Sequence, residues 1–117
     1  MSKNIVKFWE EHDLAVDARK NGLAGRSRVC ARRAAAHLIR EYLLENKIDP
    51  GLKNGYDLIL FMQKESIAPE AVKILHFFSE QVDINHSLPS NIDLVILLFD
   101  LAKELNVDIS SRQKPIG

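Results

Sequence analysis

The stretch Arg26–Leu44, RSRVCARRAAAHLIREYLL, predicts one long helix with two different faces. Projected at about 100° per residue, its apolar side chains fall on one side of the helix. They form a broad stripe of the kind that packs against a protein core. The stripe consists of Ala31, Ala35, Leu38, Ile39, Tyr42 and Leu43. The stretch therefore predicts the central helix of an all-α protein.

Basic side chains lie on the opposite side of this helix, spaced by seven, four and three residues. We call this set the basic ridge; it consists of Arg26, Arg33, His37 and Arg40. Two further arginines, Arg28 and Arg32, lie at one edge of the apolar stripe. Between residues 18 and 40 there are seven basic residues and no acid, although the net charge of the whole chain is zero. The segment is either a surface that binds polyanions or a solvated helix face that pairs with nearby acids.

Length and composition are those of one globular domain. The chain has 117 residues, of which 46% are hydrophobic and 27% are charged. We expect a helical bundle over residues 1–109 and a polar tail over 110–117. The longest apolar run, Leu94–Phe99, is too short to span a membrane, and the single Cys30 excludes an internal disulfide. These features predict a cytoplasmic protein.

The first helix is expected over residues 3–20, because Ile5, Phe8, Trp9, His12 and Val16 follow the spacing of an apolar stripe. It should end near Asn21–Gly22, where both residue types tolerate the left-handed conformation of a helix C-terminus. With Gly25 closing a short connector, the first two helices should form an antiparallel hairpin. The second helix is expected to continue to about Asn46.

Three shorter helices are expected in the rest of the chain, the first from Tyr56 to about Ser66 and the second beginning at Pro69. Ser90 stands three residues before Asp93, a capping-box pattern that should open the last helix. From Ile92 to Leu105 ten of fourteen residues are apolar. We therefore expect this helix to be largely buried, either at the centre of the bundle or at a subunit interface. Replacing Phe99 by Ala should cost about 3–5 kcal/mol if that residue is in the core. The excess of apolar positions predicts a homodimer.

No catalytic or metal-binding motif is present. The glycines lack the Gly-Lys-Ser/Thr of a phosphate-binding loop, and the four histidines show no zinc-site spacing. We expect no cofactor and no metal. Cys30 should pack as a small apolar side chain, and His12 and His76 should be structural.

The chain resembles the HEPN superfamily, whose members are compact bundles of about five helices. FWEEHDLAVDARKNGLAG and RSRVCARRAAAHLIREYLLENK match its first helix, glycine-containing turn and alanine-rich second helix. The segments GYDLILFM, PEAVKILHFFSEQV and the apolar closing helix follow in the same order. The resemblance implies binding of nucleotides or RNA, often as a dimer, and often beside a nucleotidyltransferase partner.

Ribonuclease members of that superfamily carry an arginine four to six residues before a histidine in the later half of the domain. Here the late histidine is His86, and the positions expected for the arginine hold Ser79, Glu80 and Gln81. The motif is therefore absent there. Arg32 and His37 have the right spacing, but in the second helix.

Three hypotheses follow. The first is a binding module whose basic ridge, with Arg28 and Arg32, holds phosphates of RNA or of a nucleotide. Protonation of His37, with an ordinary pKa near 6.5, should then strengthen binding as pH falls from about 7.5 to about 6. The second is a protein-interaction or structural dimer module without nucleic acid. The third is a metal-independent ribonuclease with His37 as base and Arg32 stabilising the transition state.

Overall fold

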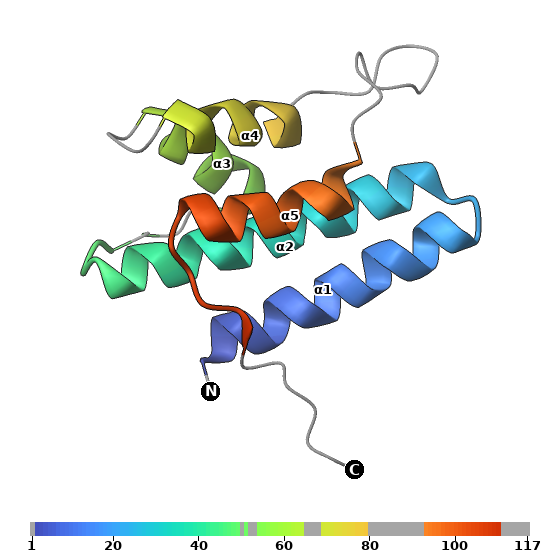
Figure 1. Ribbon diagram of the computed structural model, residues 1–117, viewed down its shortest axis with the longest axis horizontal. Coiled ribbons are helices and arrows are strands. Elements are labelled where there is room, and N and C mark those ends of the chain that lie inside the picture. The colour runs from blue at the N-terminus through green and yellow to red at the C-terminus, as the bar shows by residue number, and fades with distance from the viewer. Residues whose placement is uncertain (1, 50, 52–53, 65–68, 80–92, 111–117) are drawn as a thin grey trace.

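The computed structural model describes residues 2–49, 51, 54–64, 69–79 and 93–110. In these residues the chain is all-α, as the sequence predicted, and it forms one bundle (Figure 1). Its helices are α1 (Lys3–Lys20), α2 (Ala24–Glu45), α3 (Gly55–Lys64), α4 (Pro69–Ser79) and α5 (Leu94–Glu104).

The first two helices form the predicted antiparallel hairpin, and a tight turn joins them. Gly22 has a left-handed backbone, with φ of 73°. This conformation lets the N–H of Leu23 donate to the carbonyl of Ala18 at 2.8 Å, which closes the end of α1. The bounds of α1 match the prediction. Helix α2 begins two residues earlier than predicted, so Gly25 lies inside the helix and not in the connector.

Helix α2 is the central element, since it packs against all four of the others. The predicted apolar stripe is confirmed: Tyr42 is half-buried and the other members are buried. Helix α3 approaches α2 closely at Gly55. A Cβ atom at that position would lie 3.3 Å from the Cβ of Ala36, so the absence of a side chain permits this packing.

The remaining helices cover one side of the hairpin. Helices α3 and α4 lie together on the side of α2 and α5 that is remote from α1 (Figure 1). Helix α4 begins at Pro69 as predicted, while Ser66, the expected end of the third helix, lies outside the described residues. No helix in the described ranges has both the length and the apolar character needed to cross a membrane.

Helix α5 differs from the prediction at its start and in its burial. It is capped by Asp93, whose carboxylate accepts a hydrogen bond from the N–H of Val95 at 3.0 Å. Ser90 and Ile92 lie outside the described residues. One face, with Leu98 and Leu101, is fully buried. The opposite face is not, because Ile96 is 60% exposed and Phe99 is 42% exposed. Of the two places left open for Phe99, the structure has the surface and not the core.

The end of the described chain returns to the bundle. Val107 is buried, and Ile109 packs against the core although both follow the end of α5. The bundle thus includes the chain up to at least Ile109. Most of the expected tail, residues 111–117, lies outside the described residues.

Candidate anion-binding surface

The N-terminal half of the basic ridge is exposed to solvent. Arg26 and Arg33 both belong to the exposed class, on the side of α2 opposite its buried stripe. Within the part of the chain that the structure describes, no ion pair joins either guanidinium to a carboxylate. Both side chains border a hollow of about 230 Å³ whose other lining residues include Leu14, Asp17 and Cys30. Two cations on one helix face are thus available to an anion.

Cys30 lies beneath these arginines as a buried side chain. Burial raises the pKa of its thiol, and the nearby Glu11 carboxylate raises it further, against smaller lowering effects of Arg33 and Arg26. A thiol with a raised pKa is a poor nucleophile at neutral pH. The prediction that Cys30 packs as a small apolar side chain is confirmed by its 5% exposure.

The C-terminal half of the ridge is built differently. His37 and Arg40 are half-buried, and an Arg40 Nη1–H lies 3.3 Å from Nδ1 of His37. Burial lowers the pKa of His37 to about 4, and the charges of Arg40 and Lys7 contribute to the same shift. The imidazole is therefore neutral at pH 6 and above. The expectation that His37 titrates between pH 7.5 and 6 is wrong, because the sequence does not reveal the burial of His37 or the position of Lys7.

A second hollow adjoins Arg40 where α2 ends. It measures about 440 Å³ and is lined by Asn4, Arg40, Leu44, Lys47, Ile48 and Asp49. Lys47 has a left-handed backbone, with φ of 58°, and follows the last turn of α2. This conformation turns the chain back, so that Ile48 donates its N–H to the carbonyl of Leu43 at 2.8 Å. The hollow combines apolar side chains with two cations, one amide and one carboxylate.

Arg28 and Arg32, which the sequence also assigned to the binding surface, lie away from the ridge. Arg32 donates from Nε to the carbonyl of Phe78 at 2.7 Å, near the C-terminal end of α4. Burial lowers the pKa of its guanidinium. A cation at this end of a helix is stabilised by the helix dipole, so Arg32 ties α4 to α2.

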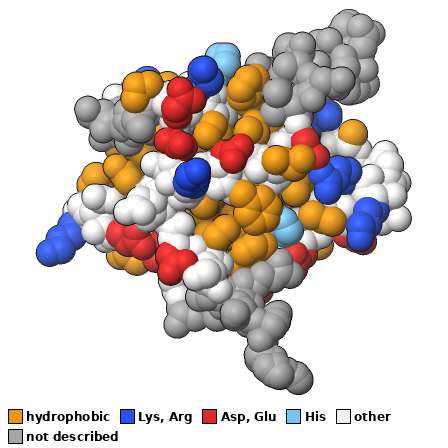
Figure 2. Space-filling view, viewed as in Figure 1, with side chains coloured by type: hydrophobic (Ala, Val, Ile, Leu, Met, Phe, Trp, Pro, Cys, Tyr) orange, Lys and Arg blue, Asp and Glu red, His pale blue; other side chains and the backbone are white. Residues whose placement is uncertain are grey.

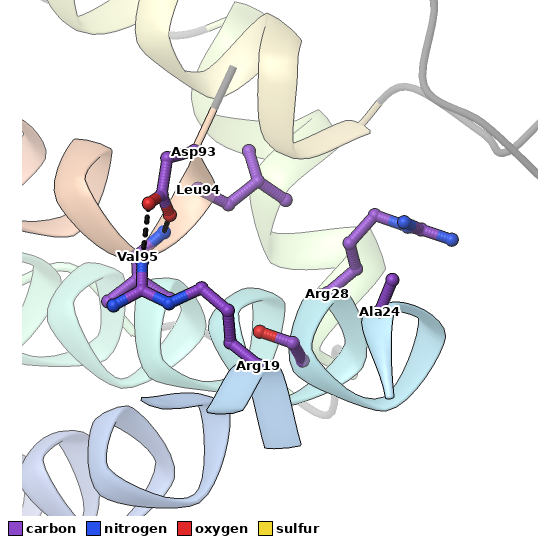
Figure 3. A pocket seen from close by; sticks show the side chains of 7 residues that line it. Arg19, Ala24, Arg28, Asp93, Leu94 and Val95 are labelled. Atoms are coloured by element: carbon purple, nitrogen blue, oxygen red, sulfur yellow. Dashed lines mark hydrogen bonds and ion pairs between the residues drawn. The ribbon is translucent and has the colours of Figure 1, made fainter. Parts of the chain in front are cut away.

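Arg28 lines a smaller hollow of about 170 Å³ at the start of α5 (Figure 3). There Arg19 of α1 pairs with Asp93, the cap of α5. Arg28 lies across the hollow from this pair, and its guanidinium extends away from it (Figure 3). The Nε atom of Arg28 is buried and has no hydrogen-bond partner among the residues that the structure describes. The structure therefore does not bring Arg28 or Arg32 together with the ridge.

The Arg32–His37 pair required by the ribonuclease hypothesis is not assembled. Arg32 bonds to α4, whereas His37 contacts Arg40 and feels the charge of Lys7 on α1. The two side chains thus leave α2 in different directions. Among the described residues, no three His, Cys, Asp or Glu side chains form a group that could hold a metal ion.

Lys7 is the residue that sequence reasoning missed. It belongs to α1, whereas the prediction searched only α2 for basic neighbours. The register of the hairpin is fixed by contacts such as Ser2 Oγ to Glu41 Oε1 at 2.5 Å and Ser27 Oγ to the carbonyl of Ala15 at 2.9 Å. This register brings position 7 level with position 37. The predicted turn at Asn21–Gly22 was the signal from which it could have been found.

The other histidines on α1 and α4 have different surroundings. His12 lies in an aromatic cluster, 5.0 Å from the ring of Trp9 and 5.4 Å from that of Phe99. Its Nδ1 also approaches Asp13 at 3.0 Å. The structural role expected of His12 fits this packing. His76 is exposed.

A second surface of interest is apolar. Figure 2 shows hydrophobic side chains gathered over α5 and the adjoining part of α1, among charged side chains of both signs. Exposed members of this group on α5 are Ile96 and Phe99, and the Phe99 ring lies 5.9 Å from that of Trp9. We call Ile96, Phe99 and Trp9 the apolar patch.

No known protein family, curated protein or solved structure matches this chain.

Proposed function

We propose that this protein is a binding module that holds phosphate groups of RNA or of a nucleotide on the basic ridge of α2. The observation that carries the proposal is the exposure of Arg26 and Arg33 on one helix face, with no ion pair to any described carboxylate. Arginine suits this role because its planar guanidinium can hold two phosphate oxygens at once. The charges of the ridge are thus available to a ligand.

The helix order supports the same proposal. A hairpin of two long helices, two short helices and an apolar closing helix is the layout that the resemblance to the HEPN superfamily implies. Members of that superfamily bind nucleotides or RNA, often beside a nucleotidyltransferase. We extend the proposal to such a partner, which would be identified by its co-purification with the tagged protein.

The test replaces Arg26, Arg33 and Arg40 by Ala and measures binding of single-stranded RNA over roughly 50 to 200 mM salt. Parent affinity should fall with salt, because bound phosphates release their counterions. The triple variant should bind more weakly, and its salt dependence should be shallower by about 0.7 for each lost contact. Circular dichroism should show an unchanged fold.

A matched control removes three exposed lysines from other helices, namely Lys64, Lys73 and Lys103. This variant has the same change in net charge but keeps the ridge. It should bind RNA nearly as well as the parent. Equal loss of binding in both triple variants would mean that RNA responds to net charge alone, and the ridge would then be an ordinary solvated helix face.

We also propose that the apolar patch is a homodimer interface. An exposed isoleucine and phenylalanine on the same helix face favour association. Sedimentation at micromolar concentration should show a dimer, and Ile96→Asp should convert it to the 13.3 kDa monomer.

The control for this variant is Leu14→Asp, which places the same charge at another exposed apolar position on α1. It should leave the dimer intact. A parent protein that sediments only as a 13.3 kDa species would contradict the proposed interface.

A further inference from the structure

A cluster of three basic groups from two helices lies at the C-terminal half of the ridge. Arg40 donates from Nη1 to Nδ1 of His37, and Lys7 on α1 lies near enough for its charge to act on the same imidazole. Lys7 is exposed, and the other two side chains are half-buried. The cluster is therefore reachable from solvent, while part of it is held in place by packing.

The hydrogen bond assigns the tautomer of His37. A guanidinium has only donors, so Nδ1 must accept, and the single imidazole proton lies on Nε2. His37 thus does two things: its Nδ1 holds the Arg40 side chain, and its Nε2–H remains a donor. This neutral form is the one that the low pKa of His37 maintains at neutral pH.

The charges around the imidazole are not balanced. Helix α1 contributes Lys7, and α2 contributes Arg40. The nearest acid one turn along α2 is Glu41, which is buried and accepts hydrogen bonds at Oε1 from Ser2 and Asn4. Its carboxylate is therefore held at the hairpin contact. Among the described residues, the charges that act on His37 are those of Arg40 and Lys7, so an anion placed between these two would supply the opposite charge.

We propose that Lys7, His37 and Arg40 form a phosphate subsite of the ridge, with His37 as the residue that positions Arg40. This inference rests on the proposed function, and it locates the place where one phosphate group is held. Arg40 and Lys7 contact the phosphate oxygens, and Nε2–H of His37 adds a neutral hydrogen bond.

The adjoining hollow indicates which phosphate compound fits. Arg40 borders it, and its volume of about 440 Å³ falls within the range of small-molecule sites. Leu44 and Ile48 offer apolar surface to a flat base, and Asp49 offers a carboxylate to a sugar hydroxyl. Asp49 already accepts the N–H of Gly51 at 2.9 Å, which orients it. The ligand class is therefore a nucleoside phosphate, either free or as one unit of an RNA strand.

The experiment measures the affinity of the full chain for inorganic phosphate, adenosine monophosphate and a short single-stranded RNA at low salt and pH 7. Lys7→Ala and Arg40→Ala should each weaken binding of adenosine monophosphate about tenfold, as expected for loss of a charge-assisted hydrogen bond. The double variant Lys64→Ala/Lys73→Ala should bind adenosine monophosphate like the parent, whereas Arg26→Ala/Arg33→Ala should bind RNA more weakly. Arg40→Lys, which keeps the charge but loses the planar fork, should give an intermediate loss.

Two variants of His37 test its positioning role. Glutamine can accept from Arg40 and donate to phosphate, so His37→Gln should stay within about twofold of the parent. Leucine can do neither, so His37→Leu should weaken binding as much as Arg40→Ala does. Equal affinities of these two variants would overturn the positioning role, because a side chain that only fills space would not distinguish them.

The outcomes separate the subsite from the proposed function. Lys7→Ala and Arg40→Ala could bind adenosine monophosphate like the parent while the Arg26/Arg33 variant loses RNA binding. This result would contradict the proposed subsite but support RNA binding by the basic ridge. Binding of RNA without binding of adenosine monophosphate would show that only a strand engages the ridge, and would overturn the nucleotide-sized site. A parent that binds none of the three probes overturns the proposed function and the subsite together.

Discussion

The indole Nε1–H of Trp9 donates to the backbone carbonyl of Ile109 at 3.0 Å, and the two residues are 100 positions apart in the chain. Trp9 lies in the first half of α1, whereas Ile109 follows the end of α5. The bond therefore closes the bundle by joining its first helix to the end of its described part. Beside it, the Trp9 ring packs edge-on against Phe8 at 5.0 Å.

Replacing Trp9 by Phe should cost about 1 kcal/mol for the lost hydrogen bond, in addition to the smaller area that phenylalanine buries. Chemical denaturation followed by circular dichroism measures this change in the free energy of unfolding. The control repeats the substitution in a chain that ends at Asp108. There the carbonyl of Ile109 is absent, so the same substitution should cost about 1 kcal/mol less. Equal costs in the two chains would show that the bond contributes nothing to stability.

Phe99 and Phe78 should respond differently to the same substitution. Phe78 is fully buried, so Phe78→Ala should cost about 3–5 kcal/mol. Phe99 is 42% exposed, with ring contacts to Trp9 and His12, so Phe99→Ala should cost about 1–2 kcal/mol in the monomer. Both are measured by denaturation at low protein concentration. A loss above about 3 kcal/mol for Phe99→Ala would place its side chain in a core that the structure does not show.

The sequence predicted local structure well where one helix face carries the information. The apolar spacing of α1 and the Asn21–Gly22 turn were enough to predict its bounds and the hairpin. The burial of Phe99 was left open by the sequence for a physical reason. An apolar residue in a helical pattern can face a core or a partner, and the pattern is the same in both cases. The sequence also left open which residue caps α5, since both Ser90 and Asp93 are good capping residues.

The candidate site was predictable only within α2. The exposure of Arg26 and Arg33 follows from their projection opposite the apolar stripe. The hydrogen bond from Arg32 to the carbonyl of Phe78 cannot be predicted from this projection, because it depends on how α4 packs against α2. The effect of Lys7 on His37 likewise depends on packing between two helices. Interactions between elements distant in sequence leave no periodic pattern, so they require the structure.

Lys47 carries backbone strain at the end of α2. Its φ of 58° lies in the left-handed region, which costs a residue with a Cβ atom about 1 kcal/mol. Lys47→Gly should raise the free energy of unfolding by about 0.5–1 kcal/mol. This net gain is smaller than the relief of strain alone, because glycine has more conformational freedom in the unfolded chain. Lys47→Ala, which keeps the Cβ atom, should give no such gain. A stability of Lys47→Gly equal to that of Lys47→Ala would show that this conformation is not strained.

The low pKa of His37 should make the protein less stable in mild acid. Its pKa is about 4 in the folded protein and 6.5 in an unfolded chain. Between these values the unfolded chain binds the proton and the folded protein does not, so the free energy of unfolding falls as pH decreases. The loss from His37 should reach about 2 kcal/mol between pH 7 and pH 5, where most carboxylates still remain ionised. The full loss of stability that is due to His37 is reached only below about pH 4.

Denaturation of the parent and of His37→Gln at several pH values measures this contribution. Glutamine does not titrate, so the variant should lose about 2 kcal/mol less than the parent between pH 7 and pH 5. The comparison cancels the acidic groups and the other histidines, which both proteins share. A bound nucleoside phosphate should reduce the difference between them, because its negative charge favours the protonated imidazole. An equal loss of stability in parent and variant over this pH range would mean that His37 is solvated like a free histidine. That result would contradict its burial beside Arg40 and Lys7.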